Sequence, residues 1–359
     1  MFMFLNLVSV GSNCSVLYRS KTVYNTVHEP RHIVSNDFNN DGKLDFVVAT
    51  FGDEHFSIFL GSGNGSFQLY ASYATNVEPT AITTGDFNKD GKMDVAINNF
   101  YVSIWLGNGD GTFQKYGQYH TNAWSYSMIT SDFNNDRILD LAIANYTFHN
   151  KTSVTVLLGK GDGSFSSGIN YGNSESSYCV ISDDFNNDNK QDLAICNHDP
   201  HCITVLLGKG DGSFGNQKEY ITHPYPTSMV SGDFNLDNKL DLVVAHVGWE
   251  TGIVVLFGDD NGGFSKTELY RNVMGSLSLT VGDFNNDEKL DFVASSIYGN
   301  VISMFFGNGN GAFQNHQEFN TADYSGSLTS GDFNYDGKLD IATANYLNQS
   351  ITVFLNSCH

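Results

Sequence analysis

The sequence predicts an all-β fold, a seven-bladed β-propeller of four-stranded blades. Two patterns predict it: an acidic nine-residue segment occurs seven times along the 359 residues, and a glycine-rich turn followed by Phe lies between successive copies. The composition agrees, because 36 Gly and 27 Phe, with many Asn, Thr and Ser, favour short strands joined by frequent turns.

The acidic segment reads DFNNDGKLD at Asp37 and recurs with small changes at Asp86, Asp132, Asp184, Asp233, Asp283 and Asp332. Successive first aspartates are 49, 46, 52, 49, 50 and 49 residues apart, which is the regular period of a repeat architecture. Helical solenoids are excluded, because their repeats would show apolar residues at three- and four-residue spacing, without a turn signal roughly every ten residues.

The glycine-rich turn has forms such as FLGSGNGSF and LLGKGDGSF, in which Gly and Asn supply the positive φ values that a hairpin turn needs. In each case its Phe lies 19 residues before the next first aspartate, so the length variation falls in the other half of the repeat. The turn phenylalanines are Phe67, Phe113, Phe165, Phe214, Phe264 and Phe313.

Each repeat therefore divides into four strands: one that ends at the Asp-Phe pair, one that starts at the last aspartate, one before the glycine turn and one after its Phe. The second strands, such as LDFVVAT and LDLVVAH, are nearly continuous in apolar residues, as expected for sheets packed on both faces. We expect residues 18–359 to form a single propeller. Residues 1–17 are a lead segment, either a weak secretory signal or a remnant strand.

The acidic segments carry oxygen ligands at alternate positions. Positions one, five and nine are Asp and position three is Asn, and the backbone carbonyl of position seven adds a further oxygen, which suits the six to eight oxygens that Ca²⁺ accepts. Three carboxylates this close repel one another without a cation, so an ordinary Asx turn is not a full account. The predicted ligands of up to seven Ca²⁺ ions are Asp37, Asn39, Asp41, Lys43 and Asp45; Asp86, Asn88, Asp90, Lys92 and Asp94; Asp132, Asn134, Asp136, Ile138 and Asp140; Asp184, Asn186, Asp188, Lys190 and Asp192; Asp233, Asn235, Asp237, Lys239 and Asp241; Asp283, Asn285, Asp287, Lys289 and Asp291; and Asp332, Asn334, Asp336, Lys338 and Asp340.

Other cation sites fit the segments less well. An EF-hand needs a bidentate Glu at its twelfth position, whereas the twelfth positions here, such as Val48 and Ile97, are apolar and lie inside predicted strands. Mg²⁺ prefers strict octahedral geometry with retained waters. Position six normally takes Gly or Asn for a left-handed backbone, so Arg137 and Glu288 weaken the expectation of calcium in the third and sixth segments.

With these residues the chain resembles the FG-GAP and VCBS repeat family, which includes the amino-terminal propeller of integrin α subunits. The resemblance extends from about Ser20 to Leu355 and rests on the sevenfold DFNxDxxxD recurrence. It implies a propeller that holds calcium in the loop between the first and second strands of each blade.

The net charge of the chain limits the classes of partner that it can bind. A formal net charge of −21 disfavours nucleic acid and anionic membrane surfaces, and no apolar stretch is long enough to insert into a bilayer. The aspartates of the seven segments make up 21 of the 39 acidic residues, and seven Ca²⁺ ions would bring the net charge from −21 to −7. Because such sites bind at roughly 10⁻⁴ to 10⁻³ M in extracellular modules, we expect an extracellular or secreted protein.

Recognition is expected on the face opposite the acidic segments, where the variable loops between second and third strands lie. That face is predicted to carry Trp124, Tyr126, Tyr146, Trp249, Tyr298 and Tyr346, which suit either a protein partner or a glycan, although single aromatic residues can simply fill gaps between blades. His198, Asp199 and His201 fit either a metal site or a polar turn.

Three function classes follow: a protein-binding or adhesion module, a carbohydrate-binding lectin, and a polysaccharide-processing enzyme. The first is preferred. Once the calcium aspartates are set aside, no Ser, His and Asp combination or carboxylate pair stands out, so the sequence predicts a protein that is not an enzyme.

The last repeat lacks a fourth strand of its own. Tyr18 precedes Asp37 by the 19 residues that separate a turn Phe from the next segment, so residues 18–26 are predicted to pair with residues 351–355 and complete the seventh blade. Cys14 and Cys358 could form a disulfide at this closure, with Cys196 and Cys202 as a competing pair.

Overall fold

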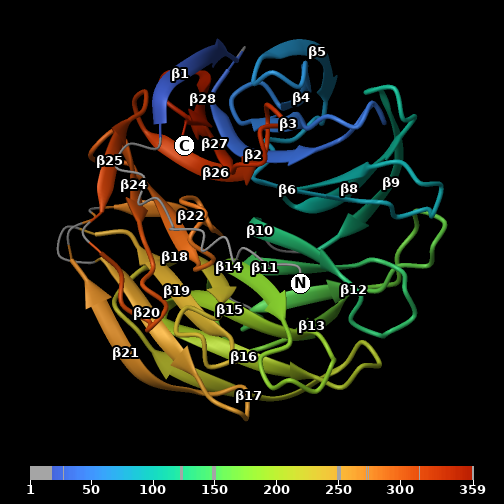
Figure 1. The fold of residues 1–359 in the computed structure, drawn as a ribbon. Coiled ribbons are helices and arrows are strands. Elements are labelled where there is room, and N and C mark those ends of the chain that lie inside the picture. Colours follow the sequence, from blue (N-terminus) through green and yellow to red (C-terminus); the bar gives the residue numbers. More distant parts are fainter. Residues whose placement is uncertain are drawn as a thin grey trace, which may run out of the picture.

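The computed structural model describes residues 18–26, 28–121, 124–147, 151–248, 252–271, 273, 275–314 and 316–357. Within these ranges the chain forms 28 β-strands and no helix, and the strands are arranged in a circle around a centre (Figure 1). The lead segment 1–17, Trp249, Cys14 and Cys358 lie outside the described residues, so the expectations attached to them remain predictions.

The strands follow the predicted fourfold division of the repeats. First strands are β2 (Pro30–Asn36), β6 (Ala81–Gly85), β10 (Trp124–Ser131), β14 (Ser176–Asp183), β18 (Pro226–Gly232), β22 (Ser276–Gly282) and β26 (Ser325–Gly331). Second strands each begin at the ninth residue of the acidic segment: β3 (Asp45–Thr50), β7 (Asp94–Asn98), β11 (Asp140–Tyr146), β15 (Asp192–Asp199), β19 (Asp241–His246), β23 (Asp291–Ser296) and β27 (Asp340–Asn345).

Third and fourth strands flank the glycine turns. Third strands are β4 (His55–Gly61), β8 (Tyr101–Gly107), β12 (Val154–Leu157), β16 (Cys202–Gly208), β20 (Ile253–Gly258), β24 (Val301–Phe305) and β28 (Ser350–Asn356). Fourth strands are β5 (Phe67–Ala74), β9 (Phe113–His120), β13 (Ile169–Tyr171), β17 (Phe214–Ile221), β21 (Phe264–Tyr270) and β25 (Gln317–Asn320), while β1 (Tyr18–Asn25) pairs antiparallel with β28.

The hydrogen-bonded sheets follow the repeats. Five sheets have four strands, and the third and fourth repeats share one eight-stranded sheet through a single residue pair between β11 and β14. Around the centre of Figure 1 the first strands contact one another in sequence, β2 with β6, β10, β14, β18, β22 and β26 in turn, and β26 contacts β2 again.

The apolar core lies between neighbouring repeats. Each second strand is buried over most or all of its length, and each core cluster combines apolar residues of two adjacent repeats. In one of these clusters Phe46 of the first repeat stacks on Phe67 and meets Phe333 of the last repeat edge-on, with ring centroids 5.1 Å apart for the latter pair. Burial on both faces explains why the second strands lack polar alternation.

The glycine turns bind the acidic segment of the preceding repeat. The amide of Gly111 donates to the carbonyl of Phe38, and Gly163, Gly212 and Gly311 make the same bond in their repeats. At Gly65 the backbone has a φ of +81° and an added Cβ would lie 2.5 Å from Leu355, so both conformation and close approach require glycine there. The acidic segments and glycine turns therefore lie on one face.

Candidate functional site

The seven acidic segments form loops with one shared backbone. Position four has a φ of 56° to 60° and position six a φ of 61° to 80° in the seven loops. Arg137 and Glu288 adopt this left-handed conformation with φ values of 64° each, as Gly42 does with 79°. The departures at position six in the third and sixth loops therefore leave the loop conformation unchanged.

The first aspartate of each loop accepts two backbone hydrogen bonds. In the first loop, Asp37 accepts from the amides of Asp41 and Gly42 at 3.2 and 2.8 Å, while Asn39 accepts from Asp41 at 3.0 Å. The carboxylate of Asp41 accepts from the amide of Lys43 at 2.9 Å. These bonds recur in the other loops, and they bring the oxygen-bearing side chains to the same end of the repeat.

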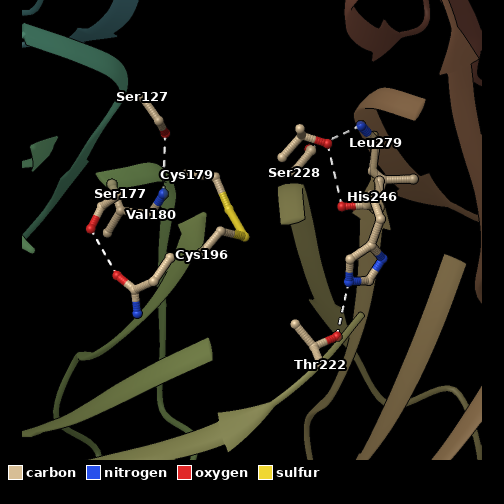
Figure 2. Close-up of a disulfide and its surroundings, with 12 residues drawn as sticks. Ser127, Ser177, Cys179, Val180, Cys196, Thr222, Ser228, His246 and Leu279 are labelled. Carbon is tan, nitrogen blue, oxygen red and sulfur yellow. Dashed lines mark hydrogen bonds between the residues drawn. A yellow bond between two sulfur atoms is a disulfide. The ribbon is translucent and has the colours of Figure 1, made fainter. Parts of the chain in front are cut away.

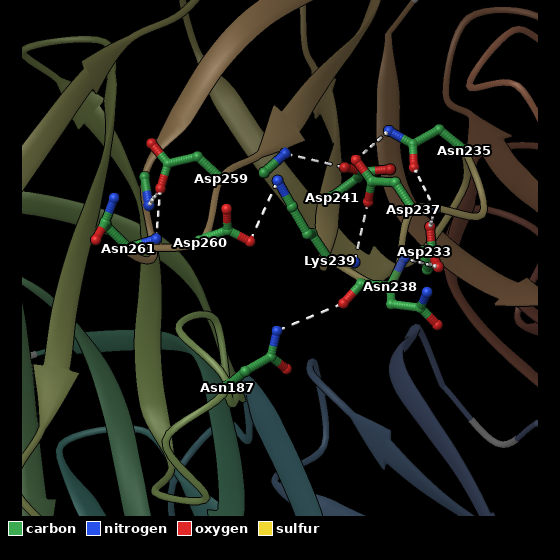
Figure 3. Close-up of polar contacts among 12 residues, drawn as sticks. Asn187, Asp233, Asn235, Asp237, Asn238, Lys239, Asp241, Asp259, Asp260 and Asn261 are labelled. Atoms are coloured by element: carbon green, nitrogen blue, oxygen red, sulfur yellow. Dashed lines mark hydrogen bonds and ion pairs between the residues drawn. The ribbon is translucent and has the colours of Figure 1, made fainter.

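Lysine at position seven compensates part of the negative charge. Lys43 Nζ lies 3.0 Å from Asp41, and equivalent pairs occur in the second, fourth, sixth and seventh loops. In the fifth loop, Lys239 instead pairs with Asp260 of the adjacent turn at 3.2 Å, as Figure 3 shows. The third loop has Ile138 at this position. Because these pairs are partly exposed, each contributes little to stability.

The ninth aspartate of each loop is buried and links the second strand to the acidic loop and to the end of the third strand. Asp45 accepts from the amide of Phe38 at 3.0 Å and from that of Gly61, at the end of β4, at 2.8 Å. Burial, with a smaller contribution from the carboxylates of Asp41 and Asp37, raises the pKa of Asp45 to about 6, although the two backbone hydrogen bonds act to lower it. The same two bonds hold Asp94, Asp140, Asp192, Asp241, Asp291 and Asp340.

The donor set of each loop fits a hard cation. Four side chains offer oxygen atoms, and a carboxylate oxygen that accepts one N–H retains a lone pair for a second partner. Among the described residues, however, no three His, Cys, Asp or Glu side chains are gathered as a metal site. His198, Asp199 and His201 therefore do not form a metal site of this kind, and His198 stacks instead on Tyr178 with ring centroids 4.6 Å apart.

A cavity of about 520 Å³ lies at the centre of the opposite face. Its wall is periodic in the sequence: one lining residue of each repeat lies seven positions before the Phe of the acidic loop, and these are Arg31, Thr80, Tyr126, Tyr178, Thr227, Leu277 and Gly326. The ends of the second strands add His198, Val247, Ile297 and Tyr346. We call this space the central cavity.

A column of stacked planar groups lines one side of the central cavity. The guanidinium carbon of Arg31 lies 5.1 Å from the ring centroid of Phe51 and 5.5 Å from that of Tyr126. Tyr126 stacks on Tyr178 at 4.7 Å with an interplanar angle of 17°, and Tyr178 stacks in turn on His198. Burial raises the pKa of Tyr178 to about 12, which keeps its hydroxyl protonated.

The structure brings together part of the predicted aromatic set. Tyr126 and Tyr346 line the central cavity, and Tyr146 contacts both Tyr126 and Tyr178. Trp124 packs instead on Phe100 at 4.4 Å, and Tyr298 is exposed and is not part of the cavity wall.

Sequence reasoning missed Arg31, Tyr178, His32 and Tyr324, which also line the cavity. Arg31 and Tyr178 occupy the same repeat position as Tyr126. An alignment of the seven repeats on their acidic segments would have identified them.

The cysteine pairing differs from the one considered from the sequence. Cys179 on β14 and Cys196 on β15 face each other across the sheet and form a disulfide (Figure 2). Cys202 is a buried free thiol that accepts from Asn197. Cys196–Cys202 was therefore the wrong competing pair, because the side chain of Cys196 points to the first strand of its repeat.

The circle of four-stranded units and the repeated acidic loops define the class of the protein, a repeat-built β-propeller. A family model described as FG-GAP-like repeat matches residues 37–97, 184–244, 233–294 and 283–343, together more than half of the chain. The chain belongs to the FG-GAP-like repeat family. A search of curated protein sequences gives no match.

Solved structures support the fold. Two structures of BBS1N in complex with ARL6DN, one soaked with lead and one with mercury, superpose with TM-scores of 0.68 and 0.66 at 10% and 11% sequence identity. In both comparisons the match covers 94% of this chain and 96% of the other. At this identity the similarity concerns the fold alone. Among the described residues, no helix has the length and apolar character needed to cross a bilayer.

Proposed function

We propose that the chain is a protein-interaction module built on a closed ring of seven blades. The observation that supports seven blades is the core itself, because the cluster containing Phe46 and Phe333 joins the first repeat to the last as the other clusters join neighbours. Pairing of β1 with β28 supplies a fourth strand to the last repeat and covers an edge that would otherwise be exposed. Such a ring is a rigid platform for the loops at its two faces.

The central cavity carries the proposal of partner binding. The cavity is concave and lies on the face of the variable loops. Its wall combines aromatic side chains with hydroxyl groups, as expected of an interaction hot spot. The similar BBS1N structures hold a protein partner, ARL6DN, which supports a protein as the partner class for this chain. We propose that the module is not catalytic.

Calcium belongs to the same proposal. Asp37, Asn39, Asp41 and the carbonyl of Lys43, with their equivalents, are the groups that would hold Ca²⁺, and Asp45 would complete each set. A bound divalent cation would neutralise clustered carboxylates and stabilise the folded loops. We place the protein outside the cell, where calcium is plentiful enough for sites of this kind.

An interaction screen against extracellular proteins and a glycan array, with and without chelator, tests the proposal. We expect a protein partner whose binding weakens at least about tenfold in Tyr346→Ala and in Tyr126→Ala. Tyr335→Ala is the matched control, because Tyr335 is exposed on the acidic-loop face. Loss of binding in Tyr335→Ala alone would show that the partner binds the acidic-loop face instead. Binding confined to glycans would show that the ligand is a carbohydrate and not a protein.

A further inference from the structure

The central cavity has a charge opposite to that of the whole chain. Acidic residues outnumber basic ones by 39 to 18 in the sequence, yet none of the residues lining the cavity is Asp or Glu. Its ionisable groups are Arg31, His32, His198 and four tyrosines. Burial lowers the pKa of His32 to about 4 and also lowers that of His198, so the charge of the cavity at neutral pH is the guanidinium of Arg31.

The hydrogen-bonding capacity of Arg31 is unused. Phe51 and Tyr126 cover its guanidinium, and a guanidinium held between ring faces presents its N–H groups at its edge. Among the described residues, no hydrogen bond or ion pair is formed by these N–H groups. Glu29, two residues away, interacts with the hydroxyl of Tyr346 instead. A guanidinium that is planar and fixed in orientation favours a carboxylate, which it binds with two parallel hydrogen bonds.

The two tyrosines of the column, Tyr126 and Tyr178, also offer edges rather than faces. Tyr126 is covered by Arg31 on one side and Tyr178 on the other, and Tyr178 is covered by Tyr126 and His198. Sugar rings bind aromatic side chains through their faces, so the column offers a neutral glycan little surface to stack on. Ring edges carry partial positive charge and protonated hydroxyl groups donate, and both favour an anion.

We propose that the central cavity binds a carboxylate of the partner protein, presented by an acidic side chain and held by the guanidinium of Arg31. This inference rests on the proposed function and specifies its chemistry. Hydroxyl groups of Ser127, Ser228, Ser278 and Ser327 also line the cavity and accept from backbone amides of neighbouring repeats, but a hydroxyl donates to a neutral amide as well as to a carboxylate. Arg31 is therefore the group that distinguishes an acidic from a neutral side chain.

The test uses blocked tripeptides as probes. Binding of N-acetyl-Gly-Glu-Gly-amide and N-acetyl-Gly-Gln-Gly-amide to the full chain is measured by ligand-observed NMR, with methyl glucuronide as a third probe. We expect the Glu peptide to bind about tenfold more tightly than the Gln peptide, and this preference to be lost in Arg31→Gln. Arg31→Lys, which keeps the charge but not the fork, should retain an intermediate preference.

Arg137→Gln is the matched control, because it removes an Arg from the acidic-loop face and should leave the preference unchanged. Equal binding of the Glu and Gln peptides, or an undiminished preference in a folded Arg31→Gln protein, would overturn the proposal. Binding of methyl glucuronide without the Glu peptide would reassign the cavity to an acidic sugar.

The partner identified by the screen separates this inference from the proposed function. If Tyr346→Ala abolishes partner binding while Arg31→Gln leaves it unchanged, the proposed protein-interaction function is supported and the proposal of a bound carboxylate is wrong. If no protein partner requires this face, the proposed function fails, whatever the peptides show.

Discussion

The amide of Gly65, in the glycine turn of the first repeat, donates a hydrogen bond to the carbonyl of Phe333, in the acidic loop of the last repeat, across 2.9 Å. The same bond joins Gly111 of the second repeat to Phe38 of the first, two repeats that are consecutive in the sequence. The contact between the first and last repeats is thus built from the same parts that join sequential repeats.

Tyr24 provides the first prediction, on the strength of this interface. Its hydroxyl lies 3.3 Å from both the carbonyl of Gly65 and the amide of Phe67, and Tyr119 makes the equivalent contact with Phe165 at 3.0 Å. We expect Tyr24→Phe and Tyr119→Phe each to lower the free energy of unfolding by about 1 kcal/mol in denaturant titrations. If the first variant costs nothing while the second does, the first and last repeats are not joined in solution.

Much of this fold was predictable because the same strand pattern recurs in all seven repeats. The second strands begin at the predicted ninth aspartates, and residues 18–25 pair with β28. Two fourth strands begin later than their turn Phe, since Phe165 and Phe313 form only isolated bridges before β13 and β25.

The sites were less predictable, because side-chain partners depend on neighbouring repeats. The DFNxDxxxD pattern identifies Asp45 as a ligand candidate but does not reveal that one of its oxygens accepts from an amide of the acidic loop and the other from an amide of β4. Nor does the local sequence around Arg31 show that Tyr126 of another blade covers its guanidinium. Both facts arise only when the repeats are placed in a circle.

Substitutions at Asp45 and Asp41 separate the structural role of the loop from its proposed cation. Asp45→Ala leaves two buried amides without an acceptor, so we expect a loss of at least about 2 kcal/mol of unfolding free energy even in chelator. Asp41→Ala changes an exposed side chain and should cost less than about 1 kcal/mol there.

The number of bound calcium ions should then differ between the wild-type chain and the Asp41→Ala variant. We expect calcium to raise the melting temperature of the wild-type chain, and Asp41→Ala to reduce the number of bound ions by one in equilibrium dialysis. Melting curves that coincide in calcium and in chelator would show that the loops are held by their hydrogen bonds and lysine pairs alone.

Ser228 joins two neighbouring first strands and provides a third prediction. Its hydroxyl accepts from the amide of Leu279 at 3.1 Å, and Ser127 does the same for Val180 at 3.2 Å, as drawn in Figure 2. Ser228→Ala should lower the free energy of unfolding by about 1–2 kcal/mol, because it leaves a backbone donor without a partner. Ser167→Ala, at an exposed position, is the control and should be close to neutral.

Cys202 should be unreactive in the native protein. Its side chain is buried, and burial raises the pKa of the thiol, so little thiolate is present at neutral pH. In a Cys14→Ser/Cys358→Ser background we expect alkylation by iodoacetamide only after denaturation, as followed by mass spectrometry. Rapid labelling of the folded chain would mean that β16 opens locally.

His246 gives the stability a pH dependence of definite sign. The imidazole is fully buried, its Nδ1 contacts the carbonyl of Gly252 at 3.1 Å and its Nε2 contacts the hydroxyl of Thr222 at 2.9 Å (Figure 2). Burial, with a smaller contribution from the nearby His223, whose ring centroid lies 6.0 Å away, lowers the pKa of His246 to about 4. The folded state therefore favours the neutral ring.

Between pH 4 and the unfolded value of 6.5, the unfolded chain binds a proton at this residue that the folded chain does not. The contribution of His246 to stability is thus complete above pH 6.5 and declines as the pH falls toward 4, by at most about 3 kcal/mol. The buried aspartates act in the opposite direction, because burial raises the pKa of Asp45 and its equivalents. The measurement is therefore the difference in unfolding free energy between the wild-type chain and His246→Gln, which cancels the aspartates. We expect this difference to shift against the wild type below pH 6.5, and a difference independent of pH would mean that the imidazole is protonated as easily in the folded chain as in the unfolded one.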